Sequence, residues 1–103
     1  MLARPRRPTA IVAGADIVAM GVFQVIAEAG LAVPRHISVS GYDNTMFAAL
    51  APVSLTSVDQ AGHQMGANAA RLLTERIADR HRRSTHVKLS SSLIVRRTTA
   101  PPA

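Results

Sequence analysis

The segment from residue 16 to residue 29 constrains the fold more than any other part of the chain, because it is helical in pattern and apolar on almost every side. Gln24 and Glu28 are its clear polar positions. A helix that faces solvent on one side carries one apolar stripe and one polar face. This helix is therefore predicted to be covered on two sides, by its own sheet and by a further surface.

Short apolar runs on both sides of that helix indicate strands. Residues 9–13 are typical of a strand buried on both faces, as in parallel sheets, and residues 37–41 form a second such run. Asp16 is predicted to cap the helix, and Gly30 and Pro34 are predicted to end it. Strand, helix and strand make one βαβ unit, so the fold class is α/β.

The second half of the chain has a similar but weaker pattern. A third strand is expected at 55–58, and Asp59 is predicted to cap an amphipathic helix that runs to about Asp79. Further strands are expected at 86–89 and 93–95.

Composition excludes several classes of protein. The chain has 103 residues, which is enough for one domain, and its 48% hydrophobic and 17% charged residues do not fit a disordered tail. It has no cysteine, which removes disulfides and thiolate catalysis. No apolar stretch approaches the roughly 20 residues of a membrane-spanning helix. We expect a soluble, cytoplasmic protein with no membrane contact.

The net charge of +6 raises the alternative of a small basic nucleic-acid-binding protein. The arginines gather at the two ends of the chain, and only 3% of the residues are aromatic, so stacking on bases has little support. Residues 80–83 are more simply a solvated helix end. Residues 1–7 form a basic leader that is expected to be disordered.

Catalytic and metal sites find no support in the pattern. No pair of histidines has ligand spacing, and no serine has the context of a nucleophile. We predict no enzyme activity, no metal and no cofactor. Asp43 stands out because it follows the strand at 37–41, where open α/β sheets bind ligands. From position alone, a ligand acceptor and a turn-forming residue assisted by Asn44 are equally supported.

Several short motifs, taken in order, resemble a known family. They are Pro8-Thr9-Ala10-Ile11-Val12-Ala13, Asp16 with Ala19-Met20-Gly21, Ala29-Gly30-Leu31-Ala32-Val33-Pro34, Ile37-Ser38-Val39-Ser40-Gly41-Tyr42-Asp43-Asn44, Leu55-Thr56-Ser57-Val58-Asp59-Gln60 and Leu93-Ile94-Val95-Arg96-Arg97-Thr98-Thr99. Together they look like the C-terminal part of a LacI/GalR-family transcriptional regulator.

That resemblance implies part of a type I periplasmic-binding-protein-like domain, a parallel sheet with flanking helices. Residues 8–97 would form this sensor part and residues 98–103 a tail. In the family, two lobes close around a small effector, usually a sugar or a nucleobase. Asp43 matches the ligand-binding aspartate, and Gln60 matches a position that lines the cleft. Asp16 matches the second member of an Asn-Asp pair at the ligand, whose first member is Ala15 here.

The resemblance also implies a homodimer, with Met20, Phe23 and Leu50 at the contact. The family binds operator DNA through a separate helix-turn-helix domain, and none is expected within this chain. We therefore expect a truncated regulator that is at best marginally stable alone, because the helix at 59–79 would pack on a sheet from elsewhere. The alternative with the same fold is a fragment of a transporter's sugar-binding protein.

Overall fold

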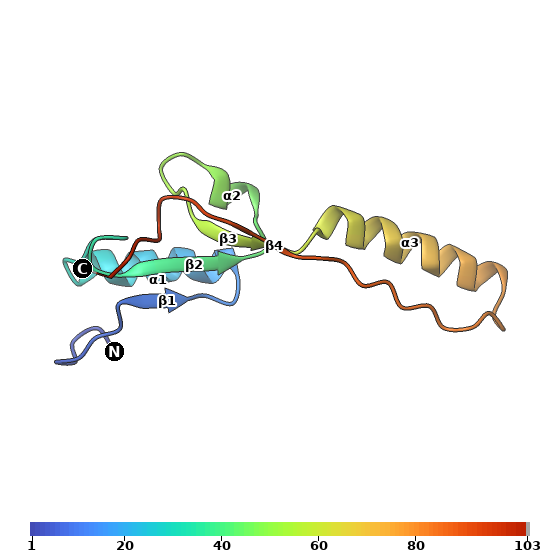
Figure 1. Ribbon diagram of the computed structural model, residues 1–103, viewed down its shortest axis with the longest axis horizontal. Coiled ribbons are helices and arrows are strands. Elements are labelled where there is room, and N and C mark those ends of the chain that lie inside the picture. Colours follow the sequence, from blue (N-terminus) through green and yellow to red (C-terminus); the bar gives the residue numbers. More distant parts are fainter. Residues whose placement is uncertain (103) are drawn as a thin grey trace.

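The computed structural model describes residues 1–102 and has two unequal parts (Figure 1). A sheet with two helices forms the body, and one long helix projects from it with the chain that returns beside it. The radius of gyration is 18.5 Å and the longest dimension is 59 Å. A compact domain of 100 residues has a radius of gyration of about 13 Å, so the projecting part dominates the shape.

The body contains four strands in the order β1-β2-β3-β4. The strands β1 (Ala10–Val12), β2 (Ser38–Tyr42) and β3 (Thr56–Asp59) are parallel, and β4 (Ser92–Ile94) pairs antiparallel with β3. The sheet is therefore mixed. Because β1, β2 and β3 run the same way, their carboxyl ends meet at one edge, where β4 begins.

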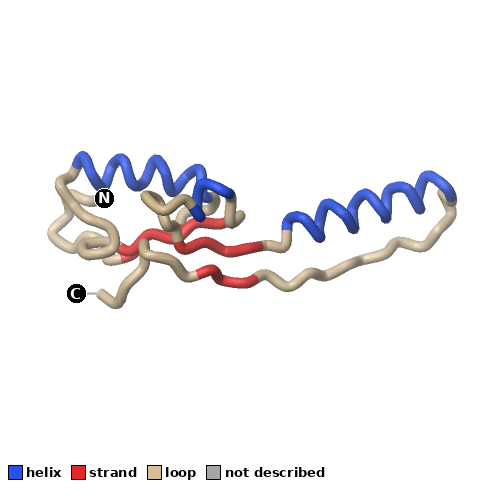
Figure 2. Tube along the Cα trace, turned by 90° about the horizontal axis from the view of Figure 1, so that it is seen from above, coloured by secondary structure: helices blue, strands red, loops and turns tan. Residues whose placement is uncertain are grey.

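The helix α1 (Asp16–Glu28) connects β1 to β2 and forms the predicted βαβ unit. It lies on the same side of the sheet as the short helix α2 (Met46–Ala49) (Figure 2). Ile26 of α1 packs with Ile37, Val39 and Leu55 in the core between helix and sheet. Gly30 takes the left-handed conformation, with φ of 69°, and ends the helix as predicted.

The two predicted caps are wrong. The N-cap of α1 is Ala15, and Asp16 is the first helical residue with its carboxylate bonded elsewhere. The helix α3 (Gly62–Ala78) begins three residues after Asp59, behind Ala61 in a left-handed turn. Asp59 Oδ1 accepts the N–H of Ala61 and so stabilises the turn that precedes the helix.

Thr98 and Thr99 belong to the body, although the sequence places them in a tail. The backbone N–H of Val39 donates to the carbonyl of Thr98, and the Thr98 hydroxyl donates to the carbonyl of Val39. The same hydroxyl accepts the N–H of Thr56. Thr98 thus fills the space between the starts of β2 and β3, which local pattern does not reveal.

The helix α3 buries none of its residues. Its apolar positions Leu73 and Ile77 are 60% and 70% exposed. The returning chain runs beside α3 in both views (Figures 1 and 2), and the strand expected at 86–89 does not form. A strand needs a hydrogen-bonded neighbour, and that segment has only the side of a helix next to it.

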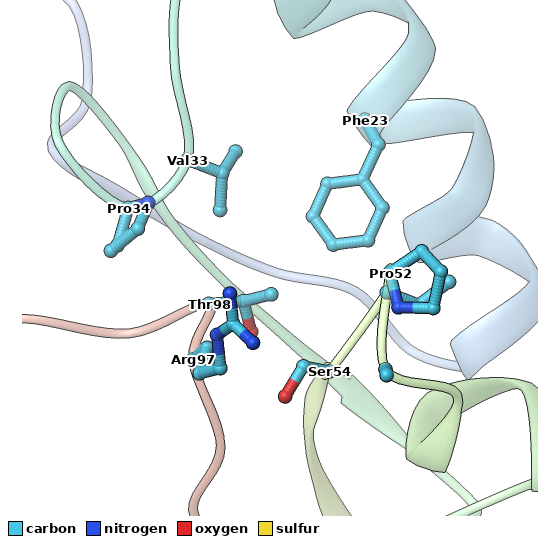
Figure 3. Close-up of a pocket in the computed structure, with 9 residues that line it drawn as sticks. Phe23, Val33, Pro34, Pro52, Ser54, Arg97 and Thr98 are labelled. Carbon is cyan, nitrogen blue, oxygen red and sulfur yellow. The ribbon is translucent and has the colours of Figure 1, made fainter.

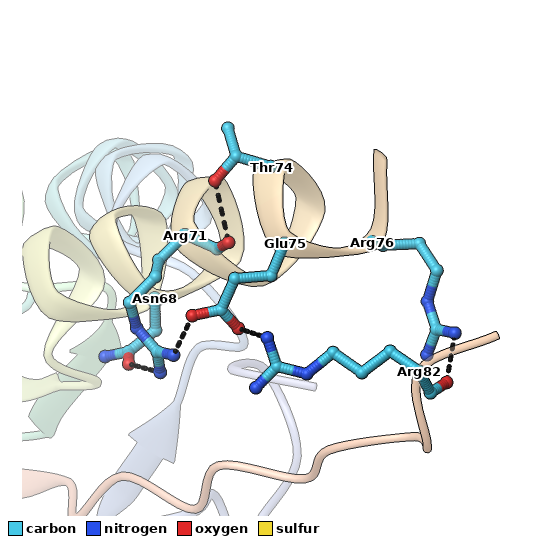
Figure 4. Close-up of polar contacts among 6 residues, drawn as sticks. All are labelled: Asn68, Arg71, Thr74, Glu75, Arg76 and Arg82. Atoms are coloured by element: carbon cyan, nitrogen blue, oxygen red, sulfur yellow. Dashed lines mark hydrogen bonds and ion pairs between the residues drawn. The ribbon is translucent and has the colours of Figure 1, made fainter. Parts of the chain in front are cut away.

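Polar contacts hold the far end of α3 (Figure 4). Arg71 Nη1 lies 3.0 Å from Glu75 Oε1, and Arg82 pairs with the other oxygen of Glu75. Arg76 donates to the carbonyls of Arg80 and Arg82. These arginines join the last turns of α3 to the exposed chain at 80–83 that follows it. Exposed pairs of this kind contribute at most about 1 kcal/mol each.

We expect α3 to exchange its amide hydrogens much faster than β2 and β3. Most of a helix's stability in a protein comes from packing its apolar face, and α3 has no buried residue to supply it. Hydrogen exchange followed by NMR would measure both elements in one sample. Equal protection of α3 and the sheet, or a single cooperative thermal transition of the monomer, would contradict this prediction and the marginal stability expected from the sequence.

None of the helices formed by residues 1–102 is long and apolar enough to cross a membrane.

Candidate functional site

The candidate site lies at the carboxyl edge of β2 and β3. The chain bends sharply after β2, where Asp43 and Asn44 have φ of 104° and 47°. Residues other than glycine rarely adopt such angles, and asparagine and aspartate tolerate them best. The N–H of Asp43 donates to the carbonyl of Val58, which fixes the bend against β3. The side chain of Asp43 is exposed at this bend.

Two of the residues predicted for a ligand site meet at this edge. The side chain of Gln60 follows β3, and its Nε2 donates to Asp43 Oδ1 over 2.8 Å. Asp43 is exposed and Gln60 is partly exposed. The pair offers carboxylate and amide acceptors together with an amide donor, a combination that can bind neighbouring hydroxyl groups.

Asp16, the third predicted residue, lies beneath the edge and is 1% exposed. Its Oδ1 accepts the Ser57 hydroxyl at 2.6 Å, and its Oδ2 accepts the N–H and the hydroxyl of Thr45 at 2.7 and 2.9 Å. Ser57 Oγ in turn accepts the N–H of Asn44. Asp16 therefore positions the bend that carries Asp43, while its predicted contact with a ligand stays a prediction.

A second polar group at the edge was not found from the sequence. Asn44 donates through Nδ2 to Asp59 Oδ2 at 3.0 Å and accepts Arg96 Nη2 at 2.7 Å. Arg96 also donates to the carbonyl of Leu55. Arg96 lies 52 residues from Asn44 in the chain. The sequence showed only that Asp59 and Arg96 are charged residues next to predicted strands, which does not reveal that both bind Asn44.

The hydrogen bonds received by Asp59 lower the pKa of its carboxyl group. The backbone N–H of Ala61 contributes most, and the Asn44 amide adds to it. Both bonds favour the charged form. Asp59 therefore stays ionised at neutral pH and holds Asn44 in place beside Asp43.

These residues border an open pocket of about 570 Å³ between the sheet and the start of α3. It is lined by Asp43, Asn44, Asp59, Ala61, Gly62, His63, Gln64, Ser90 and Ser92. Carboxylates, amides and hydroxyls dominate the lining, so the pocket suits a polar, hydroxyl-bearing ligand. No cluster of three or more histidines and acids that would hold a metal ion occurs within residues 1–102.

The residues predicted for a dimer contact lie on α1 and directly after α2, and two of them, Met20 and Phe23, pack against the core. Met20 and Phe23 of α1 are partly buried, and Leu50 directly after α2 is 50% exposed. Ile17, Met46 and Phe47 are also exposed on these two helices. The bonds from Thr45 to Asp16 hold the start of α2 against the start of α1. The second apolar side of α1 predicted from the sequence therefore continues onto α2.

Comparison with known proteins agrees with this architecture. Residues 1–99 match the family described as the periplasmic binding protein-like domain. The chain is 40% identical over 100 residues to the HTH-type transcriptional repressor PurR of Erwinia tasmaniensis, covering 97% of this chain and 29% of the relative. The chain thus spans less than a third of the length of that curated relative.

Two solved structures extend the comparison. A LacI family transcriptional regulator from Enterococcus faecalis with bound ribose superposes with a TM-score of 0.89 at 34% identity, covering 96% of this chain and 37% of that chain. The transcriptional regulator CelR in complex with cellobiose gives a TM-score of 0.81 at 32% identity, covering 88% of this chain and 28% of that chain.

Fold, edge pocket and relatives together define a periplasmic-binding-protein-like ligand-sensor domain. The chain belongs to the family of the periplasmic binding protein-like domain, and its relatives are LacI-type transcriptional regulators.

Proposed function

We propose that this chain is the effector-binding and dimerising part of a LacI-type transcriptional regulator, with Asp43 as the main ligand acceptor. The observation that carries the proposal is that Asp43, which accepts a hydrogen bond from Gln60, lines an open polar pocket. A carboxylate held by one amide keeps free lone pairs for a ligand. Ribose and cellobiose, the ligands of the two structural relatives, are hydroxyl-rich molecules of the kind that this pocket suits.

The effector class is a sugar or a nucleobase-like molecule. Ala15 stands next to Asp16 with a methyl group where the family resemblance implies an amide. Because alanine cannot donate or accept a side-chain hydrogen bond, the site makes fewer hydrogen bonds to a polyol. Asp43 and Gln60 then make most of the contacts that recognise the effector. Ligand binding would act by shifting the protein between states that differ in DNA affinity, through a helix-turn-helix domain joined to this one.

Replacing Asp43 with alanine is expected to weaken effector binding by about ten- to a hundredfold, because a charge-assisted hydrogen bond contributes roughly 1.5 to 3 kcal/mol. The measurement is an NMR titration of the chain with ribose, cellobiose and adenine, following the amides of Asn44 and Gln60. Asp43→Asn keeps a residue suited to positive φ and should lose less. Asp79→Ala, at the far end of α3, is the matched control. Unchanged affinity in Asp43→Ala would remove this residue from the site.

Dimerisation is the second part of the proposal. Ile17 on α1 and Met46, Phe47 and Leu50 on and after α2 are exposed apolar side chains, and such side chains suit an isologous contact. Met20 and Phe23 are partly buried against the core beside them, so Leu50 is the residue that tests the contact. Leu50→Asp should raise the dimer dissociation constant at least about tenfold, since a charge would be buried without a partner. Sedimentation equilibrium measures it. Ile77→Asp on α3 is the control, and equal effects of the two changes would refute this surface.

A further inference from the structure

A second pocket lies at the opposite end of the sheet, among the loops that lead into β2 and β3. Its volume is about 380 Å³, within the range of small-molecule sites. Phe23 of α1, Val33 and Pro34 before β2, and Pro52 and Val53 before β3 supply apolar walls. Figure 3 shows the Phe23 ring between Val33 and Pro52, facing the interior of the pocket.

Arg97 is the one charged residue in this lining. Its backbone N–H donates to the carbonyl of Ser54 over 2.9 Å, which fixes the residue at the pocket. Its guanidinium group lies across from the Phe23 ring (Figure 3). Within residues 1–102 no carboxylate pairs with it: the ion pairs lie on and beyond α3, and Glu28 at the end of α1 accepts the amide of Gln24.

The neighbouring hydroxyl does not compete for a ligand. Thr98 is buried, its hydroxyl donates to the carbonyl of Val39, and it accepts the N–H of Thr56. A guanidinium presents parallel N–H groups that match the two oxygens of a carboxylate. The pocket therefore combines one carboxylate-binding group with apolar walls, whereas the edge pocket contains two carboxylates that repel an anion.

We propose that the pocket around Arg97 is a second ligand site, and that it binds a small monocarboxylate with an apolar body. The carboxylate lies on the guanidinium of Arg97, and the apolar body lies between Phe23 and Pro52. This site is distinct from the effector pocket in both location and charge. It requires neither Asp43 nor Gln60.

The test is a titration of the full chain with benzoate, followed by NMR at the amides of Val33, Ser54 and Thr98. Benzyl alcohol is the matched neutral probe. Affinity in the millimolar range is expected for a ligand of this size. Arg97→Gln should weaken benzoate binding about tenfold and leave benzyl alcohol unchanged, while Arg97→Lys should lose less. Arg80→Gln, an exposed arginine beyond α3, should have no effect.

Three results would overturn the proposal. Equal affinity for benzoate and benzyl alcohol would show an apolar pocket without carboxylate recognition. Benzoate binding that Arg97→Gln leaves unchanged would remove the guanidinium from the site. Absence of any shift at Val33, Ser54 and Thr98 at saturating benzoate would show that the pocket takes no such ligand. Asp43→Ala serves as a further control. It should weaken effector binding at the edge pocket and leave the affinity for benzoate unchanged.

Discussion

Asp16→Ala is expected to lower the free energy of unfolding of the body by about 2 to 4 kcal/mol. The carboxylate of Asp16 is buried and accepts bonds from Ser57 and Thr45. Its removal leaves donors on both residues without a partner, and each unsatisfied buried group costs roughly 1 to 3 kcal/mol. Folded domains have only about 5 to 15 kcal/mol in total. The variant should therefore be largely destabilised.

Urea denaturation followed by the fluorescence of Tyr42 measures this change. Tyr42 is the single tyrosine, the chain has no tryptophan, and Tyr42 lies in β2. Its signal therefore reports the body without α3. Asp43→Asn is the control, since it removes an exposed carboxylate and should change stability by less than about 0.5 kcal/mol. Similar urea midpoints for the two variants would contradict the anchoring role of Asp16.

Gly41→Ala is expected to destabilise the body by about 3 kcal/mol, in the upper range for overpacked cores. A Cβ atom at Gly41 would overlap Asp16 Oδ1 and lie 2.9 Å from Leu55 Cδ2 and 3.3 Å from Asp16 Cα. Asp16 is held by its three hydrogen bonds, and Leu55 is fully buried. Neither neighbour can move without breaking other contacts.

Gly21→Ala is the matched control for that variant. A Cβ there meets no atom within 4 Å, and the residue lies in the middle of α1. Alanine is favoured over glycine in a helix by up to about 1 kcal/mol, so this change should stabilise the body. Loss of stability in both variants would show that the space around Gly41 does not determine the outcome. Combining Gly41→Ala with Asp16→Ala should be less harmful than the sum of the two, because the overlap with Asp16 Oδ1 disappears while the contact with Leu55 remains.

Residues close in sequence explain the part of the fold that was predicted correctly. Apolar runs beside a helical pattern indicated β1, α1 and β2, and Gly30 marked the end of the helix. The rule that parallel strands end at one edge also placed Asp43 next to a pocket. These inferences depend on periodicity and on turn preference, which operate over a few residues.

Contacts between distant residues explain where the predictions were wrong. Asp16 has the residue type and position of a helix cap, yet its carboxylate bonds to Ser57, 41 residues away. Arg96 reaches Asn44 across 52 residues, and Thr98 joins β2 although it follows the last predicted strand. The hydrogen-bond partner of a side chain depends on which distant residues the fold places next to it. The local sequence pattern does not predict that partner.

The amino-acid order alone was sufficient for the βαβ unit, for an α1 that is apolar on two sides, and for the position of Asp43 at the edge where we propose ligand binding. Packing settled how these parts are used: Asp16 became an internal anchor, Arg96 joined the edge, Arg97 came to face an apolar pocket, and α3 stayed unburied. The physical reason is the distance along the chain over which each kind of interaction acts. Propensity and periodicity act between neighbours, whereas burial and hydrogen-bond partners depend on which distant segments meet.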